Sequence, residues 1–92
     1  MSIETTVFTF KISVPYEEWA TAYDSEENMQ MMKELGITCL CKGIKKDDPT
    51  SVIIIEQSAE GKSIAMFKDP EVKPLIESAG HIYDSTVISR YF

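Results

Sequence analysis

The stretch FTFKISVPYEEWATAY, residues 8–23, decides the fold, because a strand pattern changes into a helix pattern within it. Every second residue of its first half is apolar, which predicts a β-strand with one buried face. These residues are Phe8, Phe10, Ile12 and Val14. Pro15 ends the alternation and suits the first turn of a helix. The apolar residues that follow recur at the helical spacing i, i+3, i+4 and i+7. They are Tyr16, Trp19, Ala20 and Tyr23.

The course of the chain after Tyr23 has two interpretations. Asp24 and Glu27 have the spacing of a capping box, which favours a break near Asp24 and a second helix that continues toward Leu35. The alternative is one continuous helix, because five side chains recur every four residues. These are Trp19, Tyr23, Glu27, Met31 and Leu35. Under either interpretation Gly36 ends the helix as a left-handed cap.

Two strand patterns follow back to back and predict a β-hairpin over residues 37–46 and 51–58. The residues between them favour turns, and they are Asp47, Asp48, Pro49 and Thr50. Gly43 is a candidate position for a β-bulge. The run from Val52 to Ile55 is apolar on both faces of its strand, so both faces need cover. The helices of so short a chain cover one face, and we expect the sheet of a second copy to cover the other.

The last third of the chain repeats the change from helix to strand. A helical pattern of apolar residues is interrupted at Asp69-Pro70, continues toward Ala79 and ends at Gly80. Residues 81–92 then form a strand pattern in which both faces carry a mixture of apolar and polar side chains, and this is typical of an edge or interface strand. The whole order is βαββαβ, an α+β, ferredoxin-like unit with a four-stranded antiparallel sheet and two helices on one face. We expect one domain over residues 1–92.

Charge and composition exclude several classes of function. Fifteen acidic residues against nine basic ones give a net charge of -6, and Arg90 is the only arginine. Nucleic acids and anionic membranes select basic surfaces, so neither is an expected partner. The N-terminal segment shows no signal-peptide pattern, and no apolar run has the length of a transmembrane helix. We therefore expect a soluble, cytoplasmic protein.

Two short motifs resemble known sites but lack essential residues. Gly61-Lys62-Ser63 follows a strand and opens a helix, as in a phosphate-binding loop, but Glu56 stands where that loop needs a glycine. Cys39 and Cys41 are expected on one face of a strand. A structural zinc site needs four ligands, which the chain does not offer around them, and two cysteines two residues apart in a strand are too far apart for an unstrained disulfide. We therefore expect both to be reduced, buried thiols. We expect neither a metal nor a cofactor.

The candidate site residues are few. His81 is the only histidine, and imidazole is the side chain whose unperturbed pKa lies nearest neutrality, so it is the candidate catalytic acid or base. A plain surface or capping role explains His81 as well. Trp19 and Tyr23 lie one helical turn apart and are candidates for the wall of a ligand pocket, although such stripes are most often core. Tyr83 and Arg90 complete the candidate ligand-binding set, Arg90 as a clamp for a carboxylate or in a peripheral salt bridge.

The order of elements, the PYEEW start of the first helix at residues 15–19 and the proline-interrupted second helix resemble the dimeric α/β-barrel superfamily. That superfamily includes the antibiotic-biosynthesis-type monooxygenases. Several shorter motifs resemble a small bacterial family of unknown function, and these are EEW at 17–19, DSEE at 24–27, KDDP at 46–49, GH at 80–81 and ST at 85–86. The resemblance implies a homodimer whose two sheets face each other, with a ligand cavity between each sheet and its helices.

Two functions remain open at this point. One is a non-catalytic homodimer that binds a small apolar or aromatic metabolite in the cavity. The other is a cofactor-independent monooxygenase-like enzyme for an aromatic or polyketide-like substrate, with His81, Trp19 and Tyr23 shaping the reaction. The chain shows residues that form pockets but not the paired groups that catalysis usually requires, and this favours the binding protein.

Overall fold

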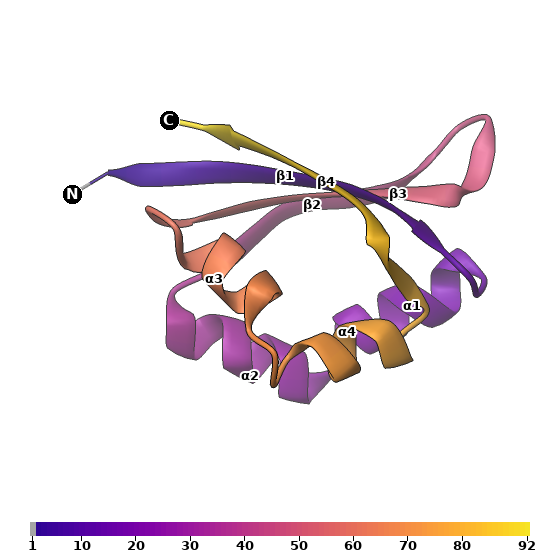
Figure 1. Ribbon diagram of the computed structural model, residues 1–92, viewed down its shortest axis with the longest axis horizontal. Helices are drawn as coiled ribbons and strands as arrows, with labels where there is room; N and C mark the ends of the chain where they lie inside the picture. The colour runs from indigo at the N-terminus through magenta and orange to yellow at the C-terminus, as the bar shows by residue number, and fades with distance from the viewer. Residues whose placement is uncertain (1) are drawn as a thin grey trace.

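The structure, a computed structural model, describes residues 2–92 and consists of one sheet with all its helices on one face (Figure 1). The strands are β1 (Ile3–Ile12), β2 (Thr38–Lys45), β3 (Asp48–Ala59) and β4 (His81–Tyr91). They pair antiparallel in the order β2-β3-β1-β4. The helices are α1 (Tyr16–Tyr23), α2 (Glu26–Leu35), α3 (Lys62–Lys68) and α4 (Lys73–Ser78). The predicted α+β, ferredoxin-like architecture is confirmed, and each predicted helix is a pair of short helices.

The core forms where the apolar face of β1 meets α1 and β3. Its buried members are Phe8, Phe10, Ile12, Trp19, Val52 and Ile54. The indole of Trp19 is 2% exposed and lies against the ring of Phe10, with 5.5 Å between ring centroids. Phe8, Phe10 and Ile12 therefore form the buried face of β1, as predicted, whereas Val14 lies beyond the end of the strand and packs half-buried against the core.

The first helical stretch is broken, as the first of the two interpretations predicted, but the capping residue differs. Ser25, not Asp24, is the N-cap of α2, and its hydroxyl accepts the N–H of Asn28 at 3.3 Å. The carboxylate of Asp24 instead forms an ion pair with Lys42 on β2, with 3.0 Å between Oδ1 and Nζ. Gly36 ends α2 with φ 71°, the left-handed cap that the sequence predicted.

The β2–β3 hairpin is tighter than predicted. Lys45 pairs with Asp48, so the turn consists of residues 46–47, and Pro49 and Thr50 belong to β3. The carboxylate of Asp48 accepts the N–H of Thr50 at 3.0 Å, which shapes the chain locally. The ladder changes register beside Pro49, so the missing N–H of this proline interrupts no regular pairing.

The β-bulge of β2 lies at Leu40 and not at Gly43, which pairs regularly with Ile53. Because of this bulge, Cys39 pairs with Glu56 on the helix side of the sheet, whereas Cys41 pairs with Ile55 on the opposite side. The prediction that the two thiols share one face and are both buried is therefore wrong. Both cysteines are free; Cys39 is half-buried and Cys41 is exposed.

The second helical stretch breaks at Asp69-Pro70 between α3 and α4, as predicted. Gly80 follows α4 with φ 95°, and a Cβ at this position would lie 2.4 Å from Cγ2 of Val14. Only glycine fits that approach, since it combines a left-handed conformation with no side chain. This close turn places His81 at the start of β4, opposite Ile12 of β1.

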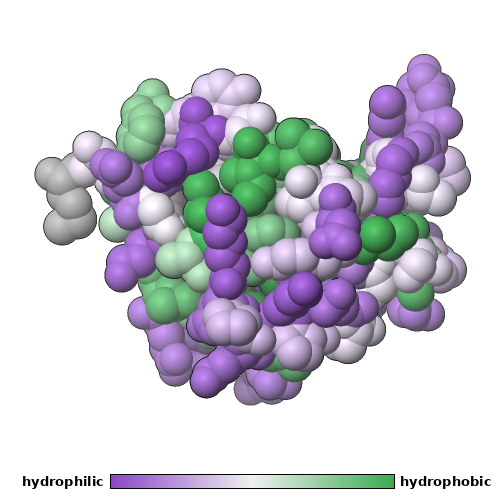
Figure 2. Space-filling model, in the orientation of Figure 1, coloured by the Kyte–Doolittle hydropathy of each residue, from purple (hydrophilic) through white to green (hydrophobic). Residues whose placement is uncertain are grey.

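The sheet face opposite the helices carries apolar side chains. Ile53 and Ile55 on β3 are half-buried there, while Val87 on β4 is 61% exposed. Figure 2 shows apolar surface gathered in the upper part of the view, over the region where β4 crosses the sheet. The position of β4 at the sheet edge agrees with the prediction for residues 81–92. Among the described residues, no helix combines the length and apolar character that crossing a membrane requires.

Candidate functional site

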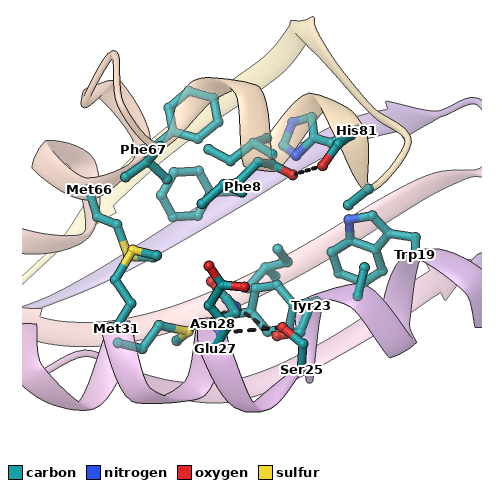
Figure 3. Close-up of a pocket in the computed structure, with 18 of the residues that line it drawn as sticks. Phe8, Trp19, Tyr23, Ser25, Glu27, Asn28, Met31, Met66, Phe67 and His81 are labelled. Atoms are coloured by element: carbon teal, nitrogen blue, oxygen red, sulfur yellow. Dashed lines mark hydrogen bonds between the residues drawn. The ribbon is translucent and has the colours of Figure 1, made fainter.

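A cavity of about 300 Å³ lies between the helices and the covered face of the sheet (Figure 3). Phe8, Ile54 and Glu56 line it from the sheet, and His81 lines it from the start of β4. The remaining lining comes from the helices and from the residues that flank them, Ser25, Val72 and Ala79. Residues from α1 and α2 form one side, and residues from α3 and α4 form the other. The volume is at the small end of the range for ligand pockets.

Aromatic rings form much of the cavity wall. The rings of Trp19 and Tyr23 stack with 5.2 Å between centroids, one helical turn apart on α1. Phe67 of α3 lies against Phe8 of β1 at 5.4 Å. Because these rings come from both helical pairs and from the sheet, a ligand body in the cavity meets π faces or edges on more than one side.

Glu56 supplies a carboxylate at the sheet side of the cavity. Its side chain is 7% exposed, and its Oε2 accepts the hydroxyl proton of Tyr23 at 2.5 Å. Burial raises the pKa of the Glu56 carboxyl, and burial together with the neighbouring Glu56 charge raises the pKa of the Tyr23 hydroxyl. Ser63, which is also buried, lines the cavity from α3.

Sequence analysis did not identify Glu56 as a site residue. A signal was present, because Glu56 continues the alternation of Val52 and Ile54 and therefore falls on the face that the helices cover. A charged residue on an otherwise apolar strand face is a buried polar group, which is the informative exception in a core.

His81 is buried and lines the cavity, but its environment differs from the expected one. Its ring stacks on Phe10 with 3.6 Å between centroids and 7° between planes, and its Nε2 lies 2.7 Å from Oγ1 of Thr86. Burial lowers the pKa of His81 to about 4. The imidazole is therefore neutral at pH 7, and its acid–base chemistry is shifted away from the neutral range that the sequence suggested.

Tyr83 and Arg90 do not line the cavity. Tyr83 stacks behind Phe67 at 4.5 Å, and its hydroxyl donates to the carbonyl oxygen of Phe67 at 2.8 Å. The Nε and Nη2 of Arg90 both donate to the carboxylate of Glu4. The salt-bridge interpretation of Arg90 therefore fits the structure, and the clamp for a ligand carboxylate does not. Trp19, Tyr23 and His81, by contrast, meet at one cavity.

In the Gly61-Lys62-Ser63 turn, a side chain of the protein already accepts the backbone N–H group that would bind a phosphate. The N–H of Gly61 donates to Oε1 of Glu4 at 2.6 Å, so a carboxylate of the chain holds the position that a phosphate would need. Within residues 2–92 no three His, Cys, Asp or Glu side chains come together as a metal site would require.

Comparison with solved structures identifies the same fold in proteins of low sequence identity. A NIPSNAP family protein from Agrobacterium tumefaciens matches with a TM-score of 0.65 and 14% identity, over 99% of this chain and 92% of that one. A candidate antibiotic biosynthesis monooxygenase from Deinococcus radiodurans matches with a TM-score of 0.54 and 16% identity, over 97% of this chain and 90% of that one. Both are similar to this chain in fold alone.

No curated protein sequence matches the chain significantly. A protein family described as a domain of unknown function, DUF3764, matches residues 3–92. The match spans nearly the entire sequence, in agreement with the resemblance to a small family of unknown function. The chain therefore belongs to the DUF3764 family.

Proposed function

We propose that this protein is a homodimeric binding protein for a small apolar or aromatic metabolite. The observation that carries the proposal is the cavity between sheet and helices, where aromatic and aliphatic side chains surround a few buried polar groups, namely Glu56, Ser63 and His81. Ligand pockets in proteins have this composition, with mostly apolar walls and a few polar groups that orient the ligand. Trp19 and Tyr23 supply stacking surfaces in that wall.

The dimer is supported by the sheet face that no helix covers (Figure 1). Ile53 and Ile55 lie on that face, and Val87 adds an exposed apolar side chain at the β4 edge. A second copy placed on this face or on the adjoining β4 would bury about 1,200 Å² or more in total, as stable interfaces do. Sedimentation at micromolar concentration should give a dimer, and a compact monomer would contradict this part of the proposal.

Ligand binding is tested by incubating the protein with a metabolite mixture, removing unbound compounds and identifying what remains by mass spectrometry. The matched variants are Ala22→Phe, which places a ring in the cavity wall, and Ala65→Phe, an exposed position on α3 outside the cavity. We expect retention by the wild type and by Ala65→Phe, and loss in Ala22→Phe. Equal retention in all three would place the binding elsewhere.

The alternative is a cofactor-independent monooxygenase-like enzyme for an aromatic or polyketide-like substrate. Its specific support is His81, a neutral imidazole in the cavity wall. If turnover of an aromatic substrate is found, His81→Gln tests the role of the imidazole, because glutamine removes the titratable ring. A pH midpoint that is the same in wild type and variant would remove His81 from the mechanism.

A further inference from the structure

We propose that the cavity selects a cationic ligand, an amine with an apolar or aromatic body whose ammonium group binds the carboxylate of Glu56. This inference rests on the proposed function, since it names the chemical class of the ligand for the same cavity. The proposal stands on three features of the described residues, namely the charge of the cavity lining, the partners of Glu56 and the aromatic walls.

The charge of the lining is one-sided. Glu56 and Glu27 contribute carboxylates, whereas no lysine or arginine is among the described residues that line the cavity. His81 is the only other ionisable side chain there besides Tyr23, and it is neutral at pH 7. An anionic ligand would leave water without meeting a counter-charge, which is costly in a buried site. A cation would meet the buried carboxylate of Glu56 at the sheet, whereas the carboxylate of Glu27 on α2 is exposed to water.

The partners of Glu56 leave room for such a cation. The hydroxyl of Tyr23 donates a hydrogen bond to this carboxylate at 2.5 Å, and the buried hydroxyl of Ser63 is a second side-chain partner, whose contact lowers the pKa of Glu56. A carboxylate can accept about four hydrogen bonds, so these two hydroxyls leave acceptor positions of Glu56 free for a further donor. The lysine nearest to Tyr23, Lys42, pairs with Asp24 and does not form an ion pair with Glu56. An ammonium group supplies both the missing donors and the missing charge.

The aromatic walls favour the same ligand class. Trp19 and Tyr23 stack in the wall next to Glu56, and Phe8 and Phe67 face the cavity from the sheet and from α3 (Figure 3). Ring faces attract cations electrostatically, through the negative charge density of the π system. The same rings stack on an aromatic ligand body, so one wall serves both ends of an amphipathic amine.

The experiment compares four probes that share a phenyl ring and differ in the terminal group: 2-phenylethylamine, 2-phenylethanol, 3-phenylpropionate and ethylbenzene. Trp19 is the only tryptophan and lines the cavity, so its fluorescence excited at long wavelength reports binding directly. We expect 2-phenylethylamine to bind about tenfold more tightly than 2-phenylethanol and ethylbenzene, a ratio typical of a single charge-assisted contact. Binding of 3-phenylpropionate should be undetectable.

The variant Glu56→Gln removes the charge and keeps the size and the oxygen that accepts from Tyr23. We expect its affinity for the amine to fall to within about twofold of that for 2-phenylethanol, with ethylbenzene binding unchanged. Glu27→Gln is the matched control, because it removes an exposed carboxylate from the same lining. In Glu27→Gln the amine should still bind more tightly than 2-phenylethanol. If the amine lost this higher affinity in Glu27→Gln but kept it in Glu56→Gln, the assignment of the ammonium site to Glu56 would be overturned.

The four probes tested on the wild-type protein decide whether the cavity prefers a cation, even if Glu56→Gln does not fold. If ethylbenzene binds and the amine binds no more tightly than it does, or if 3-phenylpropionate binds more tightly than the amine, the inference of a cationic ligand is overturned. The proposed binding function would still hold in either case. If none of the four probes changes the fluorescence or raises the melting temperature, both this inference and the proposed apolar cavity function are contradicted.

Discussion

Glu4 and Glu56 lie on the same face of the sheet, on the neighbouring strands β1 and β3, and both are buried, yet their surroundings differ. Glu4 is fully covered, pairs with Arg90 and accepts the N–H of Gly61. Glu56 has only hydroxyl partners among the described residues, those of Tyr23 and Ser63, and it faces the cavity. The Arg90 contact lowers the pKa of Glu4, whereas burial raises the pKa of Glu56.

The difference separates a structural carboxylate from a candidate binding group. Glu4 ties together the start of β1, the turn before α3 and the end of β4, and its charge is compensated within the chain. Glu56 is buried with hydroxyl partners but with no cationic partner among the described residues, and such groups cluster at functional sites. A buried carboxylate is therefore informative only together with its partners, and the predictions below test this contrast from the largest expected effect to the smallest.

The largest effect is expected for Trp19→Ala, which tests whether the surroundings of Glu56 are core or open pocket. Trp19 is 2% exposed and contacts the rings of Phe10 and Tyr23. Its truncation should lower the free energy of unfolding by about 3 to 5 kcal/mol. Denaturant unfolding at fixed protein concentration measures this. A near-neutral result would mean that the indole lines a cavity without supporting the fold.

The next effect concerns His81, the third buried ionisable group of this face. Its pKa is about 4 in the folded protein and 6.5 in the unfolded chain, so the unfolded chain binds the proton first. Stability is therefore present above pH 6.5 and decreases as the pH falls toward 4, by about 2 kcal/mol between pH 7 and pH 5. His81→Gln should flatten this part of the profile. Denaturant midpoints at pH 7 and pH 5 measure this loss of stability for the wild type and for His81→Gln. Repeating the pair in a chain that also carries Glu56→Gln removes the contribution of Glu56.

Glu4→Gln and Glu56→Gln are expected to change stability in opposite directions at pH 7. Loss of the Glu4 charge weakens its contacts with Arg90 and Gly61 and should cost about 1 to 2 kcal/mol. Loss of the Glu56 charge removes a buried carboxylate that has no cationic partner among the described residues, and it should raise the melting temperature. Thermal unfolding of both variants beside the wild type is the measurement. Melting temperatures that shift in the same direction would contradict the contrast between Glu4 and Glu56.

The pH profiles of the two glutamates should differ as well. The lowered pKa of Glu4 gives stability that is present above its unfolded value of 4.5 and is lost as the pH falls through the folded value. The raised pKa of Glu56 gives the reverse, because stability is fully present below 4.5 and is lost as the pH rises through the folded value. Melting temperatures of wild type and variants across the acid range separate the two groups.

The smallest effect is expected at Thr6, which pairs with Glu56 on one side and with Arg90 on the other. Its hydroxyl is fully buried and has no hydrogen-bond partner within the described residues. Thr6→Val keeps the shape and removes the unsatisfied oxygen, so stability should rise by up to about 1 kcal/mol. Chemical denaturation of this variant and of the exposed control Thr9→Val measures it. A loss of stability would show that Thr6 donates to one of its acidic neighbours.

Local signals predicted the breaks of the fold well. Pro15, Gly36, Pro70 and Gly80 each lie where an element begins or ends. These residues act through their own backbone conformations, which the rest of the chain changes little. The bulge at Leu40 carried no such signal, because it arises from how β2 pairs with β3. The sides on which Cys39 and Cys41 lie could therefore not be predicted from their spacing.

The candidate site was predicted in part. Trp19, Tyr23 and His81 line one cavity, while Tyr83 and Arg90 are engaged elsewhere. Helical spacing was sufficient for Trp19 and Tyr23, since both lie on one short helix. Arg90 pairs with Glu4 across 86 residues of sequence, and no local pattern contains that contact.

The amino-acid sequence by itself determined the order of strands and helices, the faces that become buried and the net charge of -6, because periodicity and charge are properties of short segments and of composition. Only the tertiary structure decided which buried polar groups have partners. Glu4 and Glu56 look alike in the sequence, and they differ because the pairing of β1 with β3 and β4 brings Arg90 to Glu4 and leaves Glu56 in the wall of the cavity. Desolvation and compensation of a charge depend on neighbours that only the folded chain assembles.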